Sequence, residues 1–137
     1  MNKPYTGGCA CGTIRYEISG EPAAMVDCQC QQCQRDSGTG HQSHLTFVAA
    51  EVKVEGEGSR WRSVGDGGTV KQRTFCATCG SSVYMTFPDA PEVFIVTPAS
   101  LDDPSRYKAQ FVSWTEAGHA WDHLDPAVPK FDRMPPG

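Results

Sequence analysis

The chain has 137 residues, a formal net charge of −4 at neutral pH and 39% hydrophobic residues. This length fits one compact domain over residues 1–137, and the composition excludes a disordered tail, a coiled coil and a fibrous repeat. A mildly acidic surface does not attract polyanions, so we expect no nucleic acid and no anionic membrane among its partners.

No apolar stretch approaches the length of a membrane helix, and the first eight residues lack the apolar core of a secretory signal. We therefore expect a cytoplasmic protein. In that reducing compartment, seven cysteines in so short a chain are not expected to form disulfides.

The predicted elements are mostly strands. In segment 14–18, Ile and Tyr alternate with Arg and Glu, which is typical of a strand with one buried face. Five further strands are predicted in chain order, at 45–48, 52–55, 70–75, 82–87 and 93–97. The polar segment 29–37 predicts a turn or two of helix, and prolines predict an extended tail across the body at 120–137. The fold class that results is mainly β with irregular loops.

The cysteines form two pairs and a triplet: Cys9 and Cys11; Cys28, Cys30 and Cys33; Cys76 and Cys79. An odd number of cysteines precludes a full disulfide set, and a disulfide within a Cys-x-Cys pair would be strained. Thiolates that lie close in sequence can surround a tetrahedral zinc ion. The spacing therefore favours zinc binding.

The two pairs look alike. Gly12 and Gly80 directly follow the second cysteine of each pair, where a knuckle must turn back and backbone N–H groups can approach the sulfurs. Each pair also leads into a predicted strand. We therefore predict that the pairs are two halves of one closed, structural four-cysteine site; buried free cysteines are the alternative.

The triplet has no fourth cysteine to complete it. A three-thiolate zinc with an open fourth position is typical of a catalytic site, and nearby Arg35 could hold a substrate carboxylate. Two alternatives stay open for the triplet. Asp27, His41 or His44 could supply a fourth ligand and close the site, or the thiols could hold no metal.

Three ordered motifs resemble one known family: GGCACG at 7–12, CQCQQC at 28–33 and FCATCG at 75–80. This is the glutathione-dependent formaldehyde-activating enzyme family, also called the centromere protein V family. The resemblance implies a β-rich fold of the Mss4-like type. It implies a structural zinc on Cys9, Cys11, Cys76 and Cys79, and a second zinc on catalytic Cys28, Cys30 and Cys33.

The resemblance also implies an activity. It is that of a carbon–sulfur lyase, which forms S-hydroxymethylglutathione from formaldehyde and glutathione, so a small thiol and an aldehyde are the expected partners. A second hypothesis is a zinc module without enzymatic activity that binds a protein partner through apolar residues around Trp114 and Trp121.

Overall fold

The computed structural model describes residues 3–135, and it is mainly β as predicted. Its elements are β1 (Tyr5–Gly8), β2 (Arg15–Ser19), β3 (Ala24–Cys28), α1 (Gln31–Ser37), β4 (Gln42–Val48), β5 (Glu51–Glu55), β6 (Ser59–Val64), β7 (Val70–Phe75), β8 (Ser82–Thr86), β9 (Val93–Val96) and β10 (Phe111–Ser113), with short 3-10 helices at Pro98–Ser100, Pro104–Arg106 and Thr115–Ala117. None of the helices in this range is long and apolar enough to cross a membrane.

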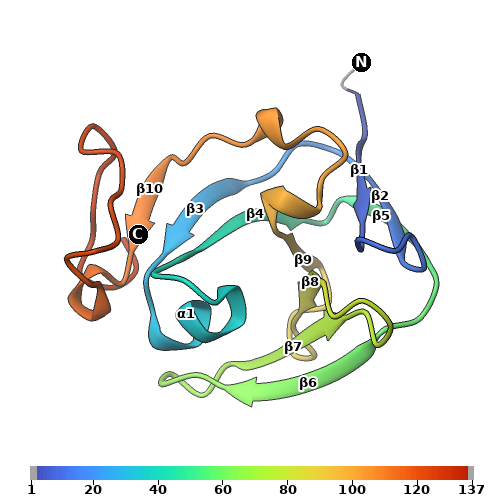
Figure 1. The fold of residues 1–137 in the computed structure, drawn as a ribbon, viewed down its shortest axis with the longest axis horizontal. Coiled ribbons are helices and arrows are strands. Elements are labelled where there is room, and N and C mark those ends of the chain that lie inside the picture. The colour runs from blue at the N-terminus through green and yellow to red at the C-terminus, as the bar shows by residue number, and fades with distance from the viewer. Residues whose placement is uncertain (1–2, 136–137) are drawn as a thin grey trace.

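The strands form two sheets. The small sheet has the order β1-β2-β5, and the large sheet has the order β10-β3-β4-β9-β8-β7-β6. All neighbouring strands are antiparallel except β10, which runs parallel to β3. The large sheet curves so that α1 lies between β4 and the β6–β7 hairpin (Figure 1).

The core lies between the two sheets. Tyr16 and Ile18 of β2 are buried, and they face the fully buried Leu45 and Phe47 of β4. The rings of Tyr5 and Phe47 meet edge to face with 5.3 Å between their centroids. The alternation seen in segment 14–18 therefore marks the face of β2 that closes the core.

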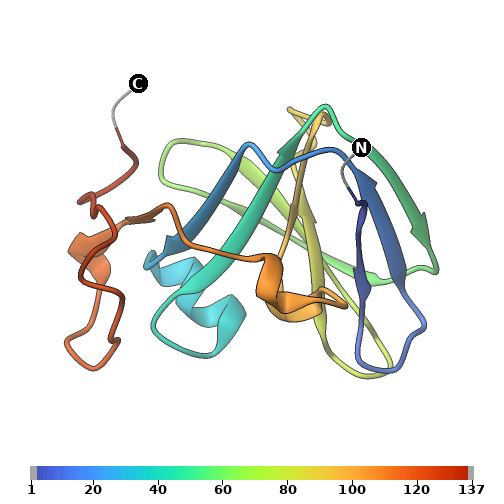
Figure 2. The same ribbon diagram turned by 90° about the horizontal axis from the view of Figure 1, so that it is seen from above.

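All six predicted strands and the predicted helix coincide with observed elements, with shifts of up to three residues at their ends. The sequence reading missed β1, β3, β6 and β10. The tail differs from its predicted course across the body. It forms a loop beside β10 at the edge of the large sheet, tied by a bridge between Val112 and Lys130 (Figures 1 and 2). Residues 136–137 of the predicted tail lie outside the described range.

The two cysteine knuckles connect strands of different sheets. The first joins β1 to β2 and the second joins β7 to β8, and each is closed by a backbone bond from residue i to residue i+5: Cys9 N–H to Ile14 (3.1 Å) and Cys76 N–H to Ser81 (3.0 Å). Gly12 and Gly80 adopt left-handed φ angles of 82° and 76°. This conformation favours glycine, as the sequence predicted for both turns.

The inter-sheet contact predicts a large loss of stability for Phe47→Ala. Removing this fully buried ring should lower the free energy of unfolding by about 3–5 kcal/mol, because it deletes apolar contacts and leaves a cavity. Urea denaturation measures the effect. Trp61→Ala is the matched control, because Trp61 is half exposed on β6, and it should cost less than about 1 kcal/mol. Equal losses in the two variants would contradict this description of the core.

Candidate metal centres

The structure brings the four paired cysteines together at one end of the two sheets. The Sγ atoms of Cys9, Cys11, Cys76 and Cys79 all lie within 4.8 Å of one another. Two of these distances, Cys9 to Cys11 and Cys11 to Cys76, are 3.7 Å. Sulfurs placed tetrahedrally around a zinc ion at its usual bond length are about 3.8 Å apart. The cluster therefore has the spacing that a closed four-thiolate site requires.

Local hydrogen bonds prepare this cluster for a cation. The backbone N–H of Ile14 donates to Cys9 Sγ (3.3 Å) and lowers the pKa of that thiol. Hydrogen bonding from Ser81, whose hydroxyl lies 3.3 Å from Cys79 Sγ, lowers the pKa of Cys79 to about 5. Both contacts favour thiolates, the form in which cysteine binds a metal.

The triplet lies where β3 passes into α1. Cys28 is the last residue of β3, Cys30 is the N-cap of α1, and Cys33 lies in its first turn. The backbone N–H of Cys33 donates to Cys30 Sγ (3.3 Å), so one sulfur caps the helix. The helix ends at Gly38 in a left-handed conformation. The three Sγ atoms again lie within 4.8 Å of one another.

The three thiols compete for protons. Hydrogen bonds from Cys28 and Cys33 lower the pKa of Cys30 to about 2, whereas hydrogen bonding with the same neighbours and burial raise the pKa of Cys33. The pKa of Cys28 is also raised, first by its hydrogen bond to Cys30. Without a cation, one thiolate is therefore stabilised by two protonated neighbours. A divalent ion is what would allow all three to ionise, so the donor set fits zinc.

His44 is the candidate fourth ligand that lies nearest the triplet. Its Nε2 atom is 4.0 Å from Cys33 Sγ and 2.8 Å from Gln42 Oε1. Because an amide oxygen can only accept, Nε2 carries the proton in this contact and does not offer a lone pair to the triplet. Burial lowers the pKa of His44 to about 4, and the charge of Lys71 acts in the same direction.

The other two candidate ligands are engaged elsewhere. Asp27 Oδ1 accepts hydrogen bonds of 2.6 Å from the hydroxyls of Ser43 and Tyr107. His41 Nδ1 is paired with the Asp122 carboxylate at 2.9 Å. Among residues 3–135, no His, Cys, Asp or Glu forms a four-membered group with the triplet within 4.8 Å.

The triplet opens into a cavity of about 920 Å³. Strand register places Met85, Ile95 and Thr46 side by side on one face of the large sheet, opposite the core face, and these residues line the cavity. Charged side chains also line the cavity. Lys71 and Arg35 contribute positive charge, and Asp66 and Glu116 contribute negative charge. Glu116 is itself paired with Arg133 at 2.7 Å.

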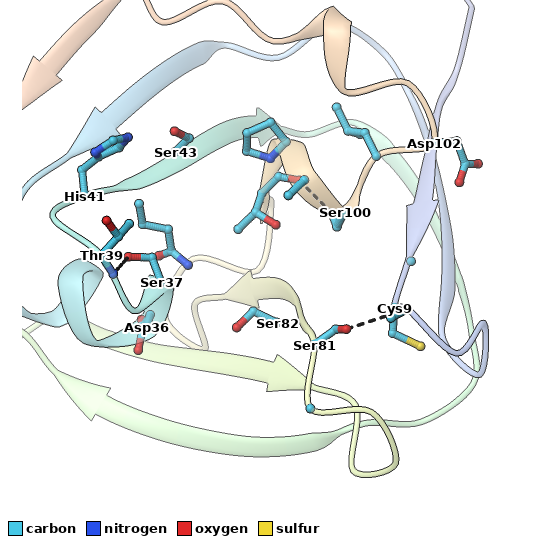
Figure 3. Close-up of a pocket in the computed structure, with 18 of the residues that line it drawn as sticks. Cys9, Asp36, Ser37, Thr39, His41, Ser43, Ser81, Ser82, Ser100 and Asp102 are labelled. Atoms are coloured by element: carbon cyan, nitrogen blue, oxygen red, sulfur yellow. Dashed lines mark hydrogen bonds between the residues drawn. The ribbon is translucent and has the colours of Figure 1, made fainter. Parts of the chain in front are cut away.

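A second cavity, of about 730 Å³, lies near the paired cysteines and contains no member of the triplet in its lining. Several of its lining residues carry hydroxyl groups: Ser37 and Thr39 lie on one side, and Ser81, Ser82 and Ser100 lie on the others (Figure 3). Of these two cavities, only the first borders the triplet.

A family model for the glutathione-dependent formaldehyde-activating enzyme matches residues 4–117, which include all seven cysteines. The chain belongs to this family. The match leaves out the C-terminal part of the chain, which contains Met134 of the cavity wall.

One relative within the family is a Halomonas elongata protein named "Putative glutathione-dependent formaldehyde-activating enzyme". It is 29% identical over 101 residues, which cover 70% of this chain and 64% of the relative. The chain thus spans less than two thirds of that relative's length. A crystal structure of a Rhodobacter sphaeroides protein has a TM-score of 0.55 at 20% identity and covers 92% of this chain and 99% of the other. This likeness shows the fold.

Some residues of the first cavity carried no sequence signal. Lys71 and Met85 come from strands far along the chain from the triplet, and only the register of the large sheet brings them near it. Trp114 is a further example, because the left-handed backbone that directs it to the cavity cannot be read from its neighbours.

The geometry of the paired cluster predicts that Cys79→Ser abolishes folding. Metal binding to a closed thiolate site contributes on the order of 10 kcal/mol to folding, and serine does not replace a thiolate ligand. We expect the purified variant to lose about one zinc per chain and its cooperative unfolding transition, measured by elemental analysis and circular dichroism.

Cys30→Ser is the matched control, because it removes one sulfur from the triplet and leaves the paired cluster unchanged. It should retain the cooperative transition. A folded Cys79→Ser protein with its full zinc content would contradict the structural role of the paired cysteines.

Proposed function

We propose that the protein is a zinc-dependent carbon–sulfur lyase that acts on the adduct of a small thiol and an aldehyde. One observation carries this proposal. The triplet lies against a large cavity, and no fourth protein ligand joins its sulfurs within the described residues. Membership of the formaldehyde-activating family supports glutathione and formaldehyde as the first pair of substrates to test.

Cys28, Cys30 and Cys33 would hold the catalytic zinc, and Cys9, Cys11, Cys76 and Cys79 would hold the structural zinc. When bound to the triplet, zinc supplies Lewis-acid stabilisation of a substrate thiolate at an open fourth position. The protein's own contribution is positional. Helix α1 and the end of β3 fix the three sulfurs beside the cavity.

The reaction involves no change in oxidation state. The substrate thiol releases its proton to solvent, and its sulfur forms a bond to the carbonyl carbon of the aldehyde. The π electrons of the carbonyl move to its oxygen, which takes a proton from solvent. The reverse sequence breaks the same carbon–sulfur bond and returns the thiol and the aldehyde.

The positive charge around the triplet suits a thiol substrate that carries carboxylate groups. The charge of Lys71 lowers the pKa of Cys30, although hydrogen bonds from Cys28 and Cys33 are the larger causes. Arg35 projects from α1 at the edge of the same cavity. These two cations can attract the carboxylates of a substrate such as glutathione while its sulfur reaches the triplet.

Exchange spectroscopy by ¹H NMR tests the proposal with glutathione and formaldehyde. The zinc-loaded protein should speed the exchange between free formaldehyde and S-hydroxymethylglutathione above its spontaneous rate. Cys30→Ser should return the rate to the spontaneous value while the fold is retained. A wild-type rate equal to the spontaneous rate would reject this pair of substrates and favour the partner-binding hypothesis.

The position of Lys71 predicts a defect in substrate binding. Lys71→Gln should raise KM for a thiol that carries carboxylate groups by about tenfold and change kcat little. The reason is that the lost contact binds a carboxylate of the substrate, and this carboxylate lies away from the reacting sulfur. Lys53→Gln is the matched control, since Lys53 is exposed on β5 and does not line the cavity. An unchanged KM in Lys71→Gln would exclude this role.

A further inference from the structure

The floor of the triplet cavity is apolar. Val26, Met85 and Ile95 line it with only 7%, 7% and 9% of their surfaces exposed, and Val93 and Phe87 extend the same surface. None of these five residues belongs to the cluster that forms the core between the sheets. The large sheet therefore has two apolar faces, and one of them borders the cavity that contains the triplet.

Strand register explains why this surface is continuous. Met85 pairs with Ile95, and Ile95 pairs with Thr46, so one row of side chains crosses three strands. Val26 pairs with His44, which places the next row directly beside the triplet. The substituent on the sulfur of a ligand bound at the triplet can therefore extend over these apolar side chains.

Two further apolar side chains line the same cavity. Trp114 and Met134 line the cavity from the C-terminal part of the chain. Trp114 has a left-handed φ angle of 59°, which is rare for a bulky residue and persists only where surrounding contacts impose it. Those contacts are a hydrogen bond from its N–H to the carbonyl of Arg133 (3.0 Å) and the Arg133 guanidinium 5.1 Å from its ring centroid.

Neither glutathione nor formaldehyde has a large apolar group that would cover this surface. Every residue of the tripeptide thiol is polar along its backbone, and formaldehyde contributes a single carbon. A cavity of about 920 Å³ lies near the upper end of the range that accommodates drug-sized ligands, which usually cover apolar walls with apolar groups. The aldehyde is the substrate best placed to supply an apolar group for this surface, because its carbon is the one joined to the sulfur.

We infer that the aldehyde substrate carries an apolar substituent of several carbons, which lies on the Val26, Met85 and Ile95 surface beneath Trp114. This inference rests on the proposed thiol–aldehyde reaction and adds the class of aldehyde. The bond changes are those given above, with a hydrocarbon chain in place of one hydrogen on the carbonyl carbon. Each methylene that leaves water completely for this surface should strengthen binding by at most about fourfold, and a chain that is only partly covered gains less.

Stable thioethers test the inference without turnover. S-methylglutathione and S-hexylglutathione carry the same tripeptide and differ only in the length of the alkyl group on sulfur. Isothermal titration calorimetry with the full-length, zinc-loaded protein should show that the hexyl compound binds at least about tenfold more tightly than the methyl compound.

Two variants locate the effect. Ile95→Thr keeps a β-branched side chain while it reduces the apolar floor, and Val93→Thr does the same at a more exposed position should the first variant fail to fold. In either folded variant, the preference for the hexyl over the methyl compound should fall from about tenfold to about fivefold or less. Val54→Thr is the matched control, because Val54 is exposed on β5 and lies outside the cavity lining, and it should keep the full preference.

The outcomes separate this inference from the proposed function. Equal affinities for the two thioethers, or a preference that survives both cavity variants, would overturn the apolar subsite even if the formaldehyde exchange reaction is accelerated. A hexyl preference that the cavity variants remove would support the subsite even if formaldehyde exchange stays at its spontaneous rate. Failure of both thioethers to bind would overturn the inference.

Discussion

Crowding of ionisable sulfur is the constraint on which the rest of this structure depends. The structure has two separate groups of thiols, and within each group the sulfur atoms lie within 4.8 Å of one another. Neither group can ionise completely unless a cation compensates the charge. The paired group ties the small sheet to the large sheet at one end of the core. The triplet has the same crowding of sulfur at the junction of a strand and a helix, beside a cavity.

The two faces of the large sheet have different tasks. Leu45 and Phe47 project from β4 into the core, whereas His44 and Thr46 project from the same strand towards the triplet cavity. Because successive side chains of a strand alternate between faces, one strand both stabilises the fold and shapes the candidate site. The large sheet curves around α1 (Figure 1), and side chains of the second face line the cavity.

The sequence predicted the elements whose physical signal is local. Alternation located β2, and the glycines after the cysteine pairs located two similar turns that the structure contains. The missed strands lack such a signal. Strand β1 ends in Gly7 and Gly8, which suggest a loop, yet a Cβ atom at Gly7 would overlap the carbonyl oxygen of Ser100, so a close backbone contact requires glycine there. Strand β10 has three residues and exists only through its parallel contact with β3.

The candidate site divides in the same way. All three cysteines of the triplet could be found from spacing, because they lie within six residues of one another. The cavity walls could not, since Lys71, Met85 and Trp114 approach the triplet only after the long-range register has formed. Their contribution is therefore a property of the sheet topology, and no short motif encodes it.

X-ray absorption at the zinc edge of the fully loaded protein tests the central claim most directly. One closed and one open thiolate site should give about 3.5 sulfur neighbours per zinc, and saturating glutathione should raise this value to about 4 as its sulfur joins the triplet. A sulfur count that glutathione leaves unchanged, together with imidazole scattering in the ligand-free protein, would show that a protein side chain closes the triplet and would contradict the account.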